Sequence, residues 1–191
     1  MAGFRCPDEA PRGNGDAGNA RERPHLRVAR GTGLSAYFDS SIVTKWYLPE
    51  ADSAAALRIR ARYEPPAVLT HLHRVELITA WHLKVFRREL QLVTVVQALS
   101  DLADDIEAGV WQAPAYDLAD VRARAEALAR RYAATLGARS LDTLHVAAAL
   151  ALGASRFVTG DRRQAALARA ARLKTTLLSP RRRRRRLNPP S

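Results

Sequence analysis

The chain has 191 residues, of which 47% are hydrophobic and 26% charged, a composition typical of a globular domain. The formal net charge is +12, but residues 31–180 hold 19 basic and 15 acidic residues, so much of the excess lies at the two ends. A mildly basic domain is compatible with a nucleic-acid partner. The longest uncharged apolar stretch, around residues 146–154, is too short to span a bilayer, which excludes an ordinary membrane-spanning helix.

The two ends differ in composition from the middle of the chain. Residues 1–33 are rich in Gly, Pro, Arg and Asn, and we expect a disordered N-terminal extension. A second disordered tail is expected over residues 180–191, which include six consecutive arginines, Arg181–Arg186. Residues 34–179 would then fold as one domain. No apolar segment follows the N-terminus, so we expect no secretory signal, and Cys6 as the only cysteine fits a reducing, cytoplasmic setting.

Short apolar runs alternate with helical patterns along this domain. We expect strands over residues 34–38, 67–70, 110–113, 156–159 and 174–177. Helices are expected over residues 41–48, 51–62, 71–88, 92–108, 118–136, 140–152 and 162–173. Ser140 is the expected N-cap of the sixth helix. This alternation indicates an α/β fold of three layers, with helices on both faces of a central, mostly parallel sheet of about four to five strands.

Two expected strands are each followed closely by a carboxylate. Asp39 ends the first strand in "AYFDSSIVTKWYLPE", and Asp161 follows the fourth in "RFVTGD". Hydroxyl groups accompany both acids: Ser40 or Ser41 beside the first and Thr159 beside the second. In open α/β sheets the functional crevice lies beyond the carboxyl ends of the strands, so we expect both acids at one site.

Two further acids lie in apolar surroundings. Glu76, in "HLHRVELITAWHL", shares a helix face with Leu72, Ala80 and Leu83, where a carboxylate is costly unless it is paired or binds a cation. Asp142 occupies the first turn of a helix whose later turns are nearly all apolar. Four carboxylates in one pocket would repel each other, and Mg²⁺ or Mn²⁺, which take oxygen ligands, would remove that repulsion. Such an ion can also activate water for attack on a phosphodiester.

Each acid alone also has a structural interpretation. Asp39 could cap the helix that begins near Ser41, while Asp142 and Asp161 could be first-turn acids favoured by the helix dipole. Glu76 could pair with Arg74 or another basic residue. The four acids together, in this order and context, are harder to explain in this way.

At this point the sequence resembles a known family. The matching segments are "YFDSSIVTKWYLPE", "HRVELITA" around Glu76, "SLDTLHVAAALALGASRFVTGD" and "LKTTLLSP", within roughly residues 34–178. In their order and spacing they are similar to the PIN-domain family, in particular to the VapC-like ribonuclease toxins of type II (VapBC) toxin–antitoxin systems.

This resemblance implies a PIN-like fold and a metal-dependent endoribonuclease that hydrolyses RNA phosphodiester bonds. Asp39, Glu76, Asp142 and Asp161 match the four acidic positions of the family, which hold one or two Mg²⁺ or Mn²⁺ ions. Ser40 or Ser41, and Thr159, match positions where hydroxyls orient those acids or a metal-bound water. The resemblance further implies a toxin that is held inactive by a cognate antitoxin protein and that forms a homodimer. The alternative is a non-catalytic PIN-like module that binds nucleic acid or serves as a scaffold.

Other candidate features carry weaker hypotheses. His71, His73 and His145 could suggest zinc, but no nearby third ligand or second cysteine completes a typical pattern, and we expect His145 to be a packing residue. Asp120 is expected on a solvated face, as is an acidic run of four residues, Asp101, Asp104, Asp105 and Glu107.

The tryptophans and the arginine tail leave alternatives of their own. The three tryptophans, Trp46, Trp81 and Trp111, are expected in the core rather than as base-stacking platforms. Arg181–Arg186 could grip phosphates, remain a solvated tail, or dock into the acidic pocket.

Overall fold

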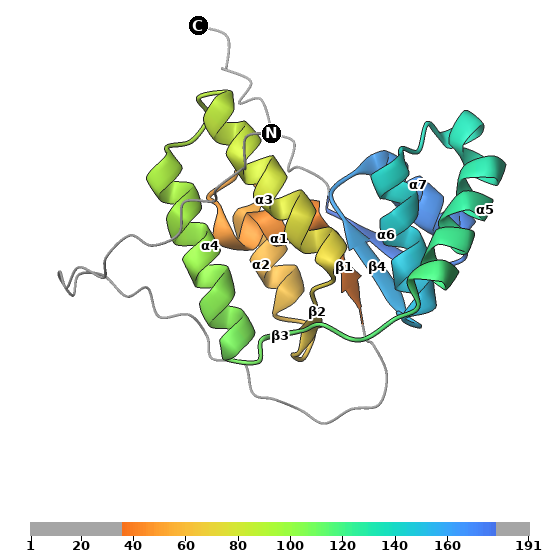
Figure 1. The fold of residues 1–191 in the computed structure, drawn as a ribbon, viewed down its shortest axis with the longest axis horizontal. Coiled ribbons are helices and arrows are strands. Elements are labelled where there is room, and N and C mark those ends of the chain that lie inside the picture. Colours follow the sequence, from red (N-terminus) through yellow and green to blue (C-terminus); the bar gives the residue numbers. More distant parts are fainter. Residues whose placement is uncertain (1–35, 179–191) are drawn as a thin grey trace, which may run out of the picture.

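The computed structural model describes residues 36–178, which form five strands and seven helices (Figure 1). The strands are β1 (Tyr37–Phe38), β2 (Ala67–Val68), β3 (Trp111–Gln112), β4 (Arg156–Thr159) and β5 (Lys174–Leu177). The helices are α1 (Ser40–Tyr47), α2 (Ser53–Arg60), α3 (His71–Phe86), α4 (Leu92–Glu107), α5 (Leu118–Leu136), α6 (Ser140–Ala151) and α7 (Arg162–Ala170).

The expected elements are all present, with small differences at their ends. Strands β2 and β3 are only two residues long, and Ser140 is the first residue of α6 while Arg139 takes the cap position. Gly137 ends α5 with a φ of 64°, a left-handed conformation that glycine adopts without strain. The expected tails, 1–33 and 180–191, lie outside the described residues. Within the described part, no helix is both long enough and apolar enough to cross a membrane.

All strand pairs in the described residues are parallel, as the alternation predicts. Strands β1, β4 and β5 form one hydrogen-bonded sheet with β4 in the middle, and β2 pairs with β3 in a second sheet. Strands β1 and β2 contact each other without a continuous ladder, so the expected single sheet of four to five strands is divided between these two.

A side chain explains where the ladder is interrupted. The Asp39 N–H donates to the Val158 carbonyl of β4 at 3.0 Å, so the preceding carbonyl, that of Phe38, faces the other side of β1. His73 Nε2 donates to this carbonyl at 2.7 Å. The first turn of α3 thus satisfies a backbone group that a neighbouring strand would otherwise pair.

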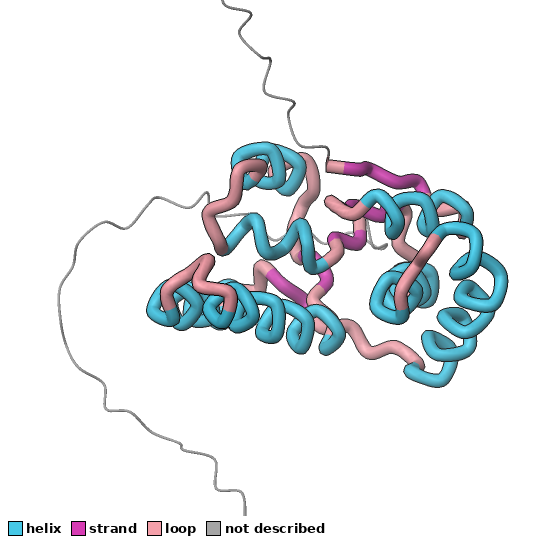
Figure 2. Tube along the Cα trace, turned by 90° about the horizontal axis from the view of Figure 1, so that it is seen from above, coloured by secondary structure: helices cyan, strands magenta, loops and turns pink. Residues whose placement is uncertain are grey.

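Consecutive residues of β1 face two separate cores, which produces the layered fold. Phe38 lies in a core built mainly from α1, α3 and α4, whereas Tyr37 lies in a second core with α5, α6 and α7. Alternate side chains of a strand point to opposite faces, so a two-residue strand suffices to join both cores. Figures 1 and 2 show the two groups of helices on either side of the strands.

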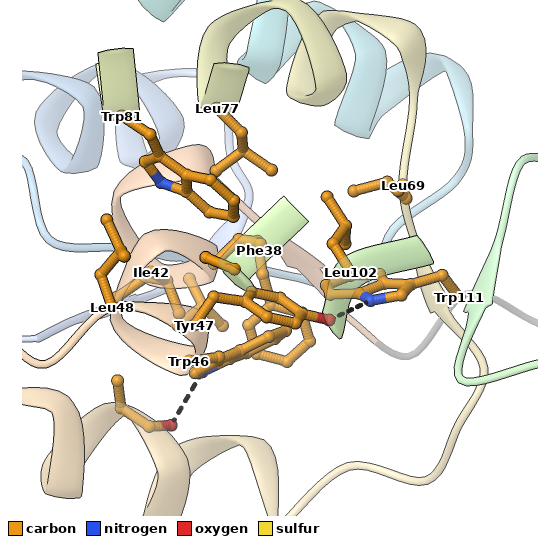
Figure 3. Packing of buried hydrophobic residues seen from close by; sticks show 14 of the residues in the cluster. Phe38, Ile42, Trp46, Tyr47, Leu48, Leu69, Leu77, Trp81, Leu102 and Trp111 are labelled. Atoms are coloured by element: carbon orange, nitrogen blue, oxygen red, sulfur yellow. Dashed lines mark hydrogen bonds between the residues drawn. The ribbon is translucent and has the colours of Figure 1, made fainter. Parts of the chain in front are cut away.

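Five buried aromatic side chains pack in the first core, among them the three tryptophans (Figure 3). Trp46 stacks on Trp111 with ring centroids 5.3 Å apart. The indole N–H of Trp111 donates to the Tyr47 hydroxyl at 2.7 Å, and that of Trp81 donates to Thr44 Oγ1 at 3.0 Å. All three tryptophans are buried, which confirms that they are core residues.

A charged cluster joins the end of α1 to α3. The Glu50 carboxylate accepts a hydrogen bond from Lys45 and pairs with Lys84 Nζ at 2.9 Å. Burial alone would raise the pKa of Glu50, but the hydrogen bonds from Lys45 and Lys84 outweigh it and lower the pKa below its ordinary value. The cluster therefore stabilises the fold when Glu50 is ionised.

Replacing Glu50 with Gln tests this stabilisation. At pH 7 we expect the free energy of unfolding to fall by about 1 kcal/mol, the upper range for a pair near the surface. Since the folded-state pKa is lowered, the contribution is present above the ordinary value of 4.5 and is lost as the pH falls through the folded value. Urea denaturation of both proteins across pH 3 to 7 measures it.

The control is Glu126→Gln, which removes an exposed helical pair with Arg130 and should change stability little. A difference between wild type and Glu50→Gln that does not depend on pH would contradict the electrostatic explanation.

Candidate functional site

Two acidic residues lie where the adjacent strands β1 and β4 end. Asp39 directly follows β1, and Asp161 follows β4 after a single glycine. Because the strands are parallel and Phe38 pairs with Val158, both end at the same edge of the sheet. The structure therefore brings these two acids to one edge, as the sequence predicts.

Both acids also cap helices. Asp39 is the N-cap of α1 and accepts from the Ile42 N–H at 3.1 Å. Asp161 is the N-cap of α7 and accepts from the N–H groups of Arg163, at 2.6 Å, and Gln164, at 3.2 Å. The capping interpretation of Asp39 is thus confirmed. Capping leaves further acceptor sites on both carboxylates, since each carboxylate has about four lone-pair sites.

Asp39 is the more deeply buried of the two, with only 3% of its surface exposed. Ser41 Oγ donates to its Oδ1 at 2.7 Å, and Thr159 Oγ1 donates to its Oδ2 at 2.6 Å. Burial raises the pKa of Asp39 to about 6, although these hydroxyls lower it in part. Most of the groups that stabilise this carboxylate are thus uncharged, so its ionised form is costly in the absence of a cation.

Hydroxyl groups connect the ends of β1 and β4. Thr159 Oγ1, which donates to Asp39, also accepts from the Asp161 N–H at 2.9 Å. Ser41 Oγ accepts from the Gly160 N–H at 3.0 Å. A Cβ on Gly160 would lie 3.0 Å from that hydroxyl oxygen, so a side chain there would crowd the contact. The predicted supporting residues Ser41 and Thr159 therefore contact the acids directly.

Glu76 lies on α3 and pairs with a buried histidine of α6. Its Oε2 is 2.6 Å from His145 Nε2, and the glutamate side chain is 30% exposed. Burial would raise the pKa of Glu76, but the hydrogen bond from His145 and the nearby Ser40 hydroxyl lower it. The interpretation of Glu76 as a paired residue is correct, but its partner is His145, whereas Arg74 is exposed.

Ser40 is buried, with 5% of its surface exposed. Its hydroxyl makes no hydrogen bond of good geometry with any residue of the described part, although it lies close enough to Glu76 to lower the pKa of that acid. A buried hydroxyl beside a carboxylate, without a well-formed hydrogen bond, is a position where a bound water or ion would satisfy the hydroxyl.

Asp142 lies at the N-terminus of α6 and is partly exposed. It accepts from the Arg139 N–H at 2.8 Å, which pairs one of the free N–H groups at the helix start. It precedes His145 by three residues, about one helical turn, and His145 contacts Glu76. The structure therefore relates Asp142 to Glu76 only indirectly, through its position one turn before His145.

The acids do not form a closed metal cage. Over residues 36–178, no three His, Cys, Asp or Glu side chains lie close enough together to enclose a metal ion. The candidate donor atoms are nevertheless all oxygens, which belong to carboxylates and to a hydroxyl. Mg²⁺ prefers such oxygens, keeps several waters and is usually held by one or two carboxylates. The residues therefore fit a hydrated Mg²⁺ or Mn²⁺ ion rather than one enclosed by all four acids.

The histidines form hydrogen bonds within the protein. His73 bonds the Phe38 carbonyl and Thr70, and burial lowers its pKa well below the ordinary value. His145 bonds Tyr37 and Glu76. His71 stacks on Tyr116 with ring centroids 5.3 Å apart. His145 is buried in packing, as expected, and also contacts a candidate site residue.

The remaining acidic candidates have structural partners. Arg124 Nε donates to both carboxylate oxygens of Asp120 on the exposed face of α5, consistent with the prediction. The prediction of a fully exposed acidic run on α4 is wrong for Asp105, which accepts from the Tyr47 hydroxyl at 2.5 Å and lies 3.9 Å from Arg60. The tail arginines, Arg181–Arg186, lie outside the described residues.

Sequence analysis missed one member of this region. Tyr37 is fully buried, and its hydroxyl lies 2.8 Å from His145 Nδ1. A tyrosine in a short apolar strand looks like an ordinary core residue. The only sequence signal was the spacing of His145, three residues after Asp142 on the same helix, which places a polar side chain one turn further into the helix.

Comparison with known proteins finds similarity to solved structures at low sequence identity. A chain in the crystal structure of FitAcB from Neisseria gonorrhoeae matches with a TM-score of 0.52 and 16% sequence identity, over 73% of this chain and 95% of that chain. No protein-family model and no curated protein matches the chain. At this identity the match concerns the fold alone, and it supports the PIN-like α/β architecture.

Replacing Thr159 with Val tests the link between the two strand ends. The buried Asp39 carboxylate would lose a hydrogen bond, and we expect the free energy of unfolding at pH 8 to fall by about 1–3 kcal/mol. Because the pKa of Asp39 is already raised to about 6, the loss should shrink at pH 5, where the group is largely protonated. Urea denaturation at both pH values, in EDTA, measures the difference.

Thr135→Val serves as the control, because Thr135 is exposed, its hydroxyl bonds only the Tyr132 carbonyl of the same helix among the hydrogen bonds described, and its loss should be nearly neutral. An equal loss for Thr159→Val at pH 5 and pH 8 would mean that the hydroxyl does not act through the Asp39 charge.

Proposed function

We propose that this chain is a divalent-metal-dependent endoribonuclease that acts as the toxin of a toxin–antitoxin system. Asp39, Glu76, Asp142 and Asp161 would hold hydrated Mg²⁺ or Mn²⁺, directly or through the waters of the ion, and act together on an RNA phosphodiester. The observation that carries the proposal is the burial of Asp39 at the end of β1. The Thr159 hydroxyl joins the Asp39 carboxylate to the backbone N–H of Asp161. A buried carboxylate supported mainly by neutral groups is stabilised when a cation binds.

A bound ion would polarise the phosphodiester and make an attacking water more acidic. The protein supplies rigid positioning. Three hydrogen bonds hold Asp39 in one orientation, and two backbone N–H groups hold Asp161. Carboxylates that are fixed before the substrate binds need little reorganisation during the reaction. Hydrolysis by water needs no covalent intermediate on the protein.

The Ser40 hydroxyl has a distinct place in this proposal. It is buried close to Glu76 and lacks a well-formed hydrogen bond within the described residues. It would donate to Glu76 or bind a water of the hydrated ion. Ser41 and Thr159 would act differently, by holding Asp39 in place.

Several features support the toxin role and its partners. The fold resembles that of the FitAcB chain, and the domain without its ends is mildly basic, as an RNA-binding protein often is. Exposed apolar side chains gather where α3 ends and α4 begins: Leu83, Phe86, Leu92, Val93 and Val96. Such exposure marks surfaces that bind other proteins. We propose a cognate antitoxin and a homodimer as partners, in a cytoplasmic setting.

The first test is RNA cleavage by the full chain and by Asp142→Asn. With Mn²⁺ or Mg²⁺ we expect discrete cleavage of total cellular RNA, abolished by EDTA. The variant should lose roughly 100-fold in rate, which corresponds to about 2.7 kcal/mol of transition-state stabilisation. Asn can still accept from the Arg139 N–H, so the helix start should be preserved.

The matched control is Asp120→Asn, another first-turn acid, whose partner is Arg124 on an exposed face. It should cleave like the wild type. Salt-sensitive RNA binding without cleavage in any metal would instead support the non-catalytic binding module.

A second test measures the metal without any substrate. Mn²⁺ should raise the thermal stability of the wild type and have little effect on Asp39→Asn. An ion at 100 times its Kd contributes about 2.7 kcal/mol. In EDTA at pH 8 we expect Asp39→Asn to be at least as stable as the wild type, because it removes a buried charge whose pKa is raised to about 6.

The expected order of stability follows from the raised folded-state pKa of Asp39. As the pH rises through this pKa, ionising Asp39 lowers the free energy of unfolding of the wild type, whereas Asn stays neutral. Equal stabilisation of both proteins by Mn²⁺ would place the ion somewhere other than Asp39.

A further inference from the structure

Three polar side chains from three elements form a chain that runs from the core to Glu76. The Tyr37 hydroxyl of β1 lies 2.8 Å from His145 Nδ1, and His145 Nε2 lies 2.6 Å from Glu76 Oε2. Tyr37 and His145 are fully buried, whereas Glu76 is partly exposed. The chain therefore connects the interior to a carboxylate that reaches solvent.

The chemistry of the partners determines where the protons lie. An ionised carboxylate only accepts hydrogen bonds, so His145 Nε2 must carry the hydrogen that bonds Glu76. Burial raises the pKa of Tyr37 well above its ordinary value, so its hydroxyl keeps its proton. In the tautomer with hydrogen on Nε2, Nδ1 accepts from the Tyr37 hydroxyl, so this tautomer of His145 satisfies both of its neighbours at once.

Ring contacts prevent His145 from turning away. Its ring meets that of His73 edge-on, with centroids 4.8 Å apart, and meets Tyr37 at 5.8 Å. Tyr37 in turn stacks on Phe157 of β4 at 5.6 Å. His73 is itself held by its bond to the Phe38 carbonyl. The imidazole is thus fixed by packing on several sides.

We propose that Tyr37 and His145 position Glu76 for metal binding, with His145 fixing the orientation of the carboxylate through its hydrogen bond to Oε2. His145 is then a positioning residue, and Tyr37 acts through it by selecting the tautomer with hydrogen on Nε2. This inference rests on the proposed function, because it assigns Glu76 a ligand role. Hydrogen bonds from neighbouring groups commonly orient metal-bound carboxylates, and their loss costs 10- to 100-fold in affinity.

The alternative is a pair that only stabilises the fold. Such a pair would link α3 to α6, and its removal would lower stability without a specific effect on metal. The two explanations differ in their prediction for a second buried hydroxyl, one in the first core, whose removal lowers stability by a similar amount. If the pair only stabilises the fold, removing either hydroxyl should affect Mn²⁺ binding equally. The chain offers a suitable comparison, because Tyr47 is another buried tyrosine whose hydroxyl bonds Asp105 and Trp111.

The experiment measures Mn²⁺ affinity by calorimetry on the full-length chain and five variants, one of which, Glu76→Gln, removes the proposed ligand charge itself. Tyr37→Phe and Tyr47→Phe each remove one buried hydroxyl. His145→Leu removes the donor to Glu76, whereas His145→Gln keeps an N–H near the position of Nε2. We expect roughly 10-fold or weaker binding for Tyr37→Phe and His145→Leu, near-normal binding for Tyr47→Phe, and substantial recovery in His145→Gln.

Imidazole ¹⁵N spectra of the metal-free chain give an independent measurement. We expect His145 as the tautomer with hydrogen on Nε2 in the wild type, and a shift away from it in Tyr37→Phe. Unchanged spectra in that variant, or equal Mn²⁺ affinities for Tyr37→Phe and Tyr47→Phe, would overturn the positioning role.

Failure of the proposed function has a different signature. If the wild type shows the expected tautomer but binds no Mn²⁺, the hydrogen-bonded chain exists and the metal role of Glu76 is wrong. If the wild type binds Mn²⁺, Glu76→Gln does not, and His145→Leu binds as tightly as the wild type, only the positioning role is wrong.

Discussion

The parallel pairing of β1 with β4 is the contact on which the rest of the structure depends. It is short, with two residue pairs, Tyr37 with Phe157 and Phe38 with Val158. It nevertheless aligns the ends of two strands that are far apart in the chain, and it places the starts of α1 and α7 beside each other. Thr159 reinforces this alignment by bonding Asp39 across a separation of 120 residues.

Because β1 has only two residues, its two side chains carry the layered architecture. Phe38 joins the aromatic core beneath α1, α3 and α4, and Tyr37 joins the alanine-rich core beneath α5, α6 and α7. The second core also encloses a group of buried polar side chains, since Tyr37, His73 and His145 pack together there. Each of these groups has hydrogen-bond partners, which is the condition for burying polar atoms without a large penalty.

Burial makes the acids of the candidate site unequal. Asp39 is enclosed and its pKa is raised, whereas hydrogen bonds lower the pKa values of Glu76 and Asp161. Groups with such different environments at neighbouring positions are frequent at functional sites. Structural networks produce the same pattern, and here the capping roles of Asp39 and Asp161 contribute to it. The same carboxylates therefore fix the starts of α1 and α7, and under the proposed function they would also serve a cation.

The sequence alone determined the order of strands and helices and the position of Asp39 and Asp161 at the ends of strands. Local hydrophobic periodicity and turn residues carry that information, because neighbours along the chain set it. Only the tertiary structure decided that His145, 69 residues away, pairs with Glu76, and that Asp105 turns inward to Tyr47. It also decided that His73 interrupts the ladder beside β1. These contacts depend on how distant helices pack on the strands, and no periodicity within a single segment specifies that packing.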